Sequence, residues 1–232
     1  NSKKDICSVV VDGFGDRSTA SISQIVDPSE INELWECPYP VSLGLFYSSI
    51  TDYLGFAINE GEYKVMGLAS FGDSNSKSAK LVRGLMDWDS SSNKMISDMS
   101  YFDYATGMTM TNKKFDKLFG GPPRKSETNL TQREMDLAAS IQKVTEEIII
   151  KLAKDIAKET GEKNLCLAGG VALNCVANGI LLREKIFDNI WIQPAAGDAG
   201  GALGAALSTW HQHHNKERSL SKGHDSMKGA YL

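Results

Sequence analysis

The segment 165–207 contains one pattern twice: a short apolar run, a glycine-rich turn, and apolar residues at helical spacing. The first turn is Gly169 and Gly170, and the second is the Gly-Asp-Ala-Gly-Gly stretch 197–201. This pattern indicates strand–turn–helix units, and consecutive parallel strands bring such turns to the ligand-binding edge of a sheet. Glycine admits close approach of backbone to a ligand, and a helix N-terminus offers free N–H groups to an anion. The segment therefore predicts two phosphate-binding turns, with turns chosen only for helix–sheet packing as the alternative.

The first third of the chain has the character of an antiparallel meander followed by helices. Strands are expected over 6–11, 18–26 and 31–37, with an Asp-Gly-Phe-Gly-Asp turn at 12–16. Apolar spacing predicts helices over 41–56 and 63–70.

A long helix is expected to begin at Thr131, because Glu134 completes a capping box and apolar positions continue to Ile156. The polar, serine- and lysine-rich residues 72–129 are expected to form a peripheral insertion. The predicted fold class is α/β: a mixed sheet of three antiparallel strands plus two parallel strands, flanked by helices.

Composition narrows the classes of function. The chain has 232 residues, 41% of them hydrophobic, and a formal net charge of −4, which disfavours a nucleic-acid partner. No apolar run is long enough to predict a membrane span.

The four cysteines lack CxxC spacing and predict reduced thiols in the cytoplasm. A first residue other than Met, followed almost at once by a strand, predicts a fragment of a longer protein.

Five motifs, in order, resemble those of one family; they lie at 11–16, 60–69, 119–124, 167–174 and 197–202. They are similar to the carbamoyltransferases of the nodulation-factor and antibiotic-tailoring type, within the actin-like ATPase (ribonuclease H-like) superfamily. Related enzymes include the tRNA threonylcarbamoyl transferases. The resemblance covers nearly the whole chain and implies that residues 1–232 form a single actin-like lobe, the second of two.

The family resemblance also implies an activity. A YrdC-like domain makes carbamoyladenylate from carbamoyl phosphate and ATP, and the actin-like domain transfers the carbamoyl group to a hydroxyl acceptor. The family's His-x-x-x-His metal motif and its YrdC-like domain are both absent from this sequence. The expected partners are therefore a small-molecule carbamoyl donor, a hydroxyl acceptor, the N-terminal lobe and the C-terminal YrdC-like domain. The isolated fragment is expected to be inactive.

The candidate site residues follow partly from the residues and partly from the resemblance. Asp12 and Lys64 are expected to be catalytic, and Asp198 by resemblance completes a divalent metal site, iron being one candidate, whose other ligands the fragment lacks. The expected contacts to ATP or carbamoyladenylate are Gly13, Gly15, Glu62, Arg124, Gly169, Gly170, Asn174 and Gly200. The turns near residues 12, 170 and 198 are predicted to converge on one nucleotide.

Each assignment has a plainer alternative. The Asp12 turn is equally typical of a hairpin, Asp198 of a helix cap, and Asn174 of an ordinary helix-face amide. Glu62 and Lys64 fit a solvated helix start, and Arg124 an exposed loop.

Other features leave the class of protein open. His211, His213 and His214 cluster, but their spacing favours a solvated helix end over a metal site. For the whole chain, an actin-like sugar kinase and a non-catalytic ATP-binding module remain the alternatives to a carbamoyltransferase.

Overall fold

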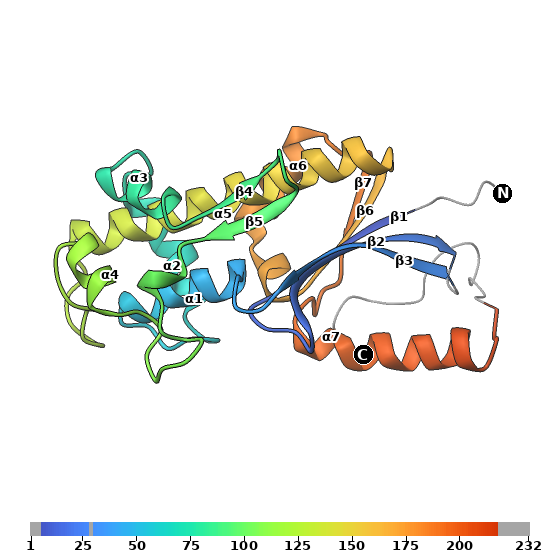
Figure 1. The fold of residues 1–232 in the computed structure, drawn as a ribbon, viewed down its shortest axis with the longest axis horizontal. Helices are drawn as coiled ribbons and strands as arrows, with labels where there is room; N and C mark the ends of the chain where they lie inside the picture. Colours follow the sequence, from blue (N-terminus) through green and yellow to red (C-terminus); the bar gives the residue numbers. More distant parts are fainter. Residues whose placement is uncertain (1–5, 28–29, 218–232) are drawn as a thin grey trace.

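The computed structural model describes residues 6–27 and 30–217 (Figure 1). The strands are β1 (Ile6–Val11), β2 (Ser18–Asp27), β3 (Glu30–Pro38), β4 (Met86–Asp89), β5 (Lys94–Ser97), β6 (Asn164–Ala168) and β7 (Asn189–Ile192). The α-helices are α1 (Leu43–Tyr53), α2 (Glu62–Leu68), α3 (Lys77–Arg83), α4 (Lys113–Leu118), α5 (Gln132–Thr160), α6 (Cys175–Glu184) and α7 (Asp198–Ser208). Short helical turns η1 (Ala69–Phe71), η2 (Met99–Tyr101), η3 (Gly170–Leu173) and η4 (Thr209–His213) complete the described elements.

The main sheet has the strand order β3-β2-β1-β6-β7. Strands β1, β2 and β3 pair antiparallel, whereas β6 is parallel to β1 and β7 is parallel to β6. The predicted α/β class, with three antiparallel and two parallel strands flanked by helices, is therefore confirmed. Because β1, β6 and β7 run in the same direction, the turns that follow them leave one edge of the sheet.

The core lies between one face of this sheet and the helices that cover it. Along β1, Cys7, Val9 and Val11 are buried and alternate with half-buried residues, as expected for a strand with one covered face. Helix α5 has 29 residues and packs against α1, α2, α3 and α6. In Figure 1 it runs from the end of the molecule near α3 and α4 to the side of the sheet formed by β6 and β7.

The predicted long helix is confirmed, including its start. Thr131 and Glu134 form the capping box, with the Thr131 N–H donating to Glu134 Oε2 at 2.9 Å. The helix ends at Gly161, which has a φ of 69° and so provides the left-handed residue that commonly follows a helix. The apolar stripe from Leu137 to Ile156 is buried, and this burial holds the helix on the sheet.

The segment 72–129 contains α3, the β4–β5 hairpin and α4, and it packs on the outer part of α5 (Figure 1). Trp88 packs edge-to-face on Trp35 of β3, with 5.2 Å between the ring centres. Its indole N–H donates to Asp155 Oδ2 of α5 at 2.7 Å. Arg83 binds Glu147 of α5 through two hydrogen bonds of 2.7 Å. The segment also contributes buried apolar side chains to the core, so it is integrated with the sheet and helices.

One element after β6 differs from the expectation. Helical apolar spacing begins at Val171, directly after the glycine turn, but α6 begins at Cys175, because the chain first makes the short turn η3 and Asn174 then caps α6. Helix α7 is present as predicted and has no buried residue, although it is rich in Ala and Leu. In the described ranges, no helix is both long and apolar enough to cross a membrane.

Candidate functional site

The turns after β1, β6 and β7 are in contact. The Gly169 N–H donates to the carbonyl of Ala196 at 2.8 Å, which joins the second turn to the third. Gly169 has a φ of 90°, and a Cβ on it would overlap the Val11 carbonyl. A Cβ on Gly170 would lie 3.1 Å from Oδ1 of Asp12. Glycine is therefore required at this junction by conformation and by close packing.

The Asp12 turn is also fixed from the side of α1. Ser42, the N-cap of α1, is fully buried and its hydroxyl lies 3.1 Å and 2.6 Å from the carbonyls of Asp12 and Gly13. A Cβ on Gly44 would come within 2.5 Å of the Gly13 nitrogen. Sequence reasoning missed Ser42 and Gly44 as parts of this site. The signal was present, because Ser followed by an apolar helix is a typical N-cap.

Four of the five glycines that were expected to contact the nucleotide use their backbone N–H groups in hydrogen bonds within the chain. The N–H groups of Gly13, Gly15, Gly169 and Gly200 donate within the chain, to Asp12 Oδ1 and to the carbonyls of Ser18, Ala196 and Gly197. The first N–H groups of η3 and α7 have no acceptor within their own helices. Among the described residues, the N–H groups at 170–171 and 198–199, where the two helical segments begin, are therefore donors that an anion at this edge can use.

Asn174 is part of a buried polar network. Its Oδ1 accepts the Ala177 N–H at 3.0 Å, which caps α6, and it also accepts from Gln142 Nε2 at 3.1 Å. Its Nδ2 donates to Gln142 Oε1 at 2.9 Å. Tyr47 donates to the same Oε1 at 3.1 Å, and Gln142 donates to Glu146 at 3.0 Å. Asn174 is thus held by α5 and α1 as well as by its own helix.

Helix α2 brings Glu62 near this network. Met66 of α2 lies 3.9 Å from the Cys175 sulfur, one residue after Asn174. Burial, and then the negative charges of Glu62 and Glu146, raise the pKa of Tyr47. Glu62 accepts the Ser48 hydroxyl at 2.6 Å and the backbone N–H of Asn59 at 3.2 Å, so it joins the loop before α2 to α1. Lys64 is exposed.

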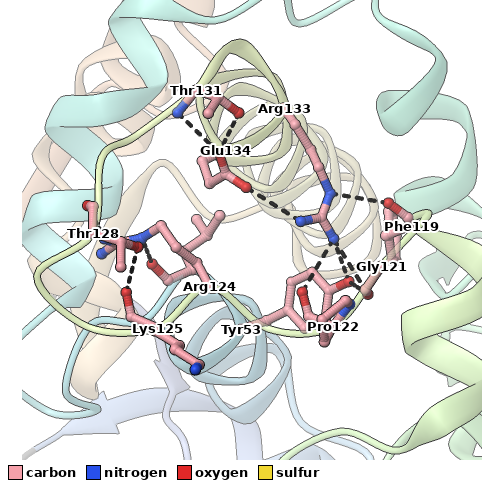
Figure 2. Close-up of polar contacts among 11 residues, drawn as sticks. Tyr53, Phe119, Gly121, Pro122, Arg124, Lys125, Thr128, Thr131, Arg133 and Glu134 are labelled. Atoms are coloured by element: carbon pink, nitrogen blue, oxygen red, sulfur yellow. Dashed lines mark hydrogen bonds and ion pairs between the residues drawn. The ribbon is translucent and has the colours of Figure 1, made fainter.

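Arg124 lies apart from the three turns. Its guanidinium donates to the carbonyls of Leu54 and Gly55 after α1 and to that of Thr128. The Asp12 turn is held at the other end of α1, and 11 helical residues span about 16 Å. Figure 2 shows Arg124 inside the loop before α5, where its donors face the backbone. In this arrangement Arg124 fixes the loop and does not join the glycine turns.

Arg133, at the start of α5, fixes the other side of the same loop (Figure 2). It donates to the carbonyl of Phe119 at 3.1 Å and to the Tyr53 hydroxyl at 2.6 Å, and its guanidinium lies 5.4 Å from the centre of the Tyr53 ring. Tyr53 in turn donates to the carbonyl of Gly121. The loop that contains Arg124 is therefore a structural connection between α1 and α5.

Asp198 is the first residue of α7 and is exposed. The N-cap of α7 is Gly197, and no side chain caps this helix, so Asp198 does not act as the cap that the plainer alternative required. Over residues 6–27 and 30–217, no cluster of three or more His, Cys, Asp or Glu side chains is arranged to hold a metal ion. Asp198 by itself does not make a metal site. His213 and His214 are exposed at the end of α7 and η4.

The cysteine thiols are unpaired. Burial, and then the charges of Glu162 and Cys166, raise the pKa of Cys7 to about 12, and burial raises the pKa of Cys37 and Cys166. These three thiols are therefore poor nucleophiles at neutral pH.

Comparison with known proteins identifies related chains. Residues 2–207 match the family model described as Carbamoyltransferase N-terminus. The uncharacterized protein sll1178 of Synechocystis is 54% identical over 222 residues, which cover 96% of this chain and 35% of the relative. The nodulation protein NolNO of Sinorhizobium fredii is 37% identical, with 86% of this chain and 27% of the relative covered.

The nodulation protein NolO of Bradyrhizobium diazoefficiens is 36% identical, with 85% of this chain and 33% of the relative covered. The chain thus spans about a third of the length of the curated relatives that it matches. The family model covers far more than half of the 232 residues, and its match includes all three glycine turns. The chain belongs to the carbamoyltransferase family and corresponds to the N-terminal region of its members.

Proposed function

We propose that this chain is one actin-like, ribonuclease H-like lobe of an O-carbamoyltransferase, and that it binds adenine nucleotide or carbamoyladenylate. The observation that supports this most directly is the convergence of the Asp12, Gly170 and Gly197 turns at one edge of the sheet. Membership of the carbamoyltransferase family indicates that one substrate is a carbamoyl donor. We assign the binding of the donor's phosphate to the three turns. The carbamoyl group would pass to a hydroxyl of a second small molecule.

The residues fit a nucleotide phosphate in two respects. Glycines at 169 and 170 leave room where a side chain would meet Val11 or Asp12. The free N–H groups at the starts of η3 and α7 can hydrogen-bond phosphate oxygens without a Lys or Arg side chain. Lys64 is our candidate for neutralising charge on the leaving phosphate. Asp12, at the centre of the junction, is our candidate for orienting the acceptor hydroxyl.

The divalent metal expected from the resemblance does not fit the described residues, because a lone carboxylate binds such an ion weakly. We propose that Asp198 contributes one ligand to a site completed by a neighbouring lobe. The same proposal extends to the partners: an N-terminal lobe and a C-terminal YrdC-like domain of the same protein. The unpaired thiols are consistent with a cytoplasmic location.

The proposal is tested in the intact enzyme that contains this region. Asp198→Ala should lower kcat for carbamoyl transfer by at least about a hundredfold, because it removes a ligand of the proposed metal site. The thermal unfolding midpoint should stay unchanged, because the side chain is exposed. Glu217→Ala, which removes an exposed carboxylate beyond η4, is the matched control. Unchanged turnover of the Asp198 variant would reject the assignment.

The donor requirement separates this proposal from the alternatives. A carbamoyltransferase gives product only when carbamoyl phosphate and ATP are both present. Acceptor phosphorylation with ATP alone would identify a sugar kinase. Nucleotide binding without product from any alcohol would identify a non-catalytic ATP-binding module.

A further inference from the structure

Gln142 connects the long helix α5 to the turn that precedes α6. It is buried, with 4% of its surface exposed, and its neighbours in the network, Tyr47 and Glu146, are 6% and 8% exposed. It lies on the buried side of α5 among apolar residues, where an unpaired amide would be costly. Each polar atom of its side chain makes two hydrogen bonds, so the amide is fully satisfied.

The orientation of Gln142 is determined by its partners. The carboxylate of Glu146 accepts a hydrogen bond, so it faces Nε2 of Gln142 at 3.0 Å. Tyr47 faces Oε1 at 3.1 Å and must donate. Its hydroxyl stays protonated because burial, and then Glu62 and Glu146, raise its pKa. A rotated amide would place oxygen against carboxylate, which the low-dielectric surroundings make unfavourable.

Hydrogen bonds from Ala177 and Gln142 fix the orientation of the Asn174 side-chain amide. The backbone N–H of Ala177 can only donate, so it fixes Oδ1, and Gln142 supplies the second donor to the same oxygen. One hydrogen of Nδ2 is committed to Gln142. An Asn amide offers two donors, so one N–H remains that no described residue accepts. Asn174 is half-buried, and this last donor is its only free hydrogen-bonding position among the described residues.

We infer that Gln142 is a positioning residue that fixes Asn174 as a hydrogen-bond donor at the glycine turn. The turn then pairs with an acceptor atom of its ligand, not a donor. We place that atom on the nucleoside part, because the proposed function assigns the backbone N–H groups at the starts of η3 and α7 to the phosphate. This inference rests on the proposed function, because it assumes that a nucleotide binds beside Gly169 and Gly170. Tyr47 and Glu146 act through Gln142 and set its orientation.

The test compares two probes, ADP and inorganic pyrophosphate, titrated calorimetrically into the 232-residue chain. Gln142→Leu should weaken ADP about tenfold, which corresponds to one lost hydrogen bond, and should leave pyrophosphate within about twofold. Gln132→Leu is the matched control, because Gln132 makes the same i,i+4 bond to a carboxylate on the exposed side of α5. Asn174→Ala combined with Gln142→Leu should bind ADP no more weakly than Asn174→Ala, since the two act as one unit.

Equal loss of ADP and pyrophosphate affinity would overturn the inference and leave a structural role for Gln142. Unchanged ADP affinity would overturn it as well. Tyr47→Phe, which removes only a hydroxyl, provides a milder variant and should weaken ADP about two- to threefold.

A ligand-free measurement separates this inference from the proposed function. In the NMR spectrum, one side-chain amide hydrogen of Asn174 should exchange slowly and the other rapidly, and Gln142→Leu should remove the difference. If the wild-type chain binds neither probe, the proposed function fails for this chain. Two equally protected hydrogens would overturn the fixed-donor geometry itself.

Discussion

At the scale of single residues, buried polar groups differ in whether they are satisfied. Thr19 and Thr145 are both 1% exposed. The Thr19 hydroxyl lies 2.5 Å from the Val41 carbonyl, whereas the Thr145 hydroxyl has no hydrogen-bond partner among the described residues. An unsatisfied buried hydroxyl costs about 1–3 kcal/mol of stability. The two threonines are therefore a natural pair for comparison.

Thr145→Val should raise the free energy of unfolding by up to about 1 kcal/mol, because it removes an unpaired hydroxyl with little change of shape. Thr19→Val should lower it by about 1–3 kcal/mol, because a buried carbonyl loses its donor. Urea unfolding at neutral pH measures both. Destabilisation by Thr145→Val as large as that by Thr19→Val would show that the Thr145 hydroxyl is paired.

The same scale shows what the sequence predicted of the site and what it did not. Glycines at 169 and 170 were predictable as a close-approach turn, because an apolar strand that ends in paired glycine before a helix is typical of one. Gln142 was not, because an amide inside an apolar helical stripe gives no signal of its partner 32 positions further along the chain. The position of Arg124 was also unpredictable, because only the folded loop aims its guanidinium at the carbonyls after α1.

At the scale of elements, α3 is joined to α5 by a bidentate ion pair between Arg83 and Glu147. Hydrogen bonding to Arg83, together with the positive charges of Arg83, Lys143 and Lys151, lowers the pKa of Glu147 despite its partial burial. The folded carboxylate thus keeps its charge at pH values where the unfolded one, with a pKa of 4.5, takes up a proton. The ion pair therefore stabilises the fold above that pH.

This contribution should disappear as the pH falls from about 4.5 through the lowered folded pKa. Glu147→Gln should consequently be less stable than the wild type at pH 7, and the two should converge toward pH 3. Urea midpoints measured across this range test the prediction. Glu127→Gln, on the exposed loop before α5, is the control and should not change the pH profile. A difference that persists at pH 3 would contradict the electrostatic explanation.

The element scale also separates predictable from unpredictable structure. The five strands of the main sheet and the capping box of α5 follow from local patterns, whereas β4 and β5 within 72–129 were not predicted. The start of α6 does not follow from a local pattern, because apolar spacing runs through 171–182 without a break. The tertiary bonds to Asn174 select Cys175 as the first residue of the helix.

At the scale of the whole molecule, α5 and α7 have opposite surroundings. Most of the apolar stripe of α5 is buried, whereas residues 201–210, which include Leu203, Leu207 and Trp210, are all exposed. An isolated helix shorter than about 12–15 residues is only marginally stable in water. The helical conformation of the 11 residues of α7 therefore depends on packing against other parts of the protein.

Hydrogen–deuterium exchange of this chain should show the contrast. Backbone amides of α7 should exchange with little protection, and those of the buried stripe of α5 should exchange only on global unfolding. Mass spectrometry of peptic peptides from the two helices measures this directly. The amides of α6, which is partly buried on α5, should fall between the two. Strong protection of α7 in the monomeric chain would contradict the prediction.

Helix α5 places Arg133 against the loop of Figure 2 and Gln142 against the glycine turn on a single rigid axis. Its 29 residues extend for about 44 Å, and each residue advances the helical phase by about 100°. One amino acid inserted between Arg133 and Gln142 would therefore rotate one set of contacts away from the other, even though every contacting side chain would still be present. The spacing along this helix is as much a determinant of the site as the identity of the residues in it.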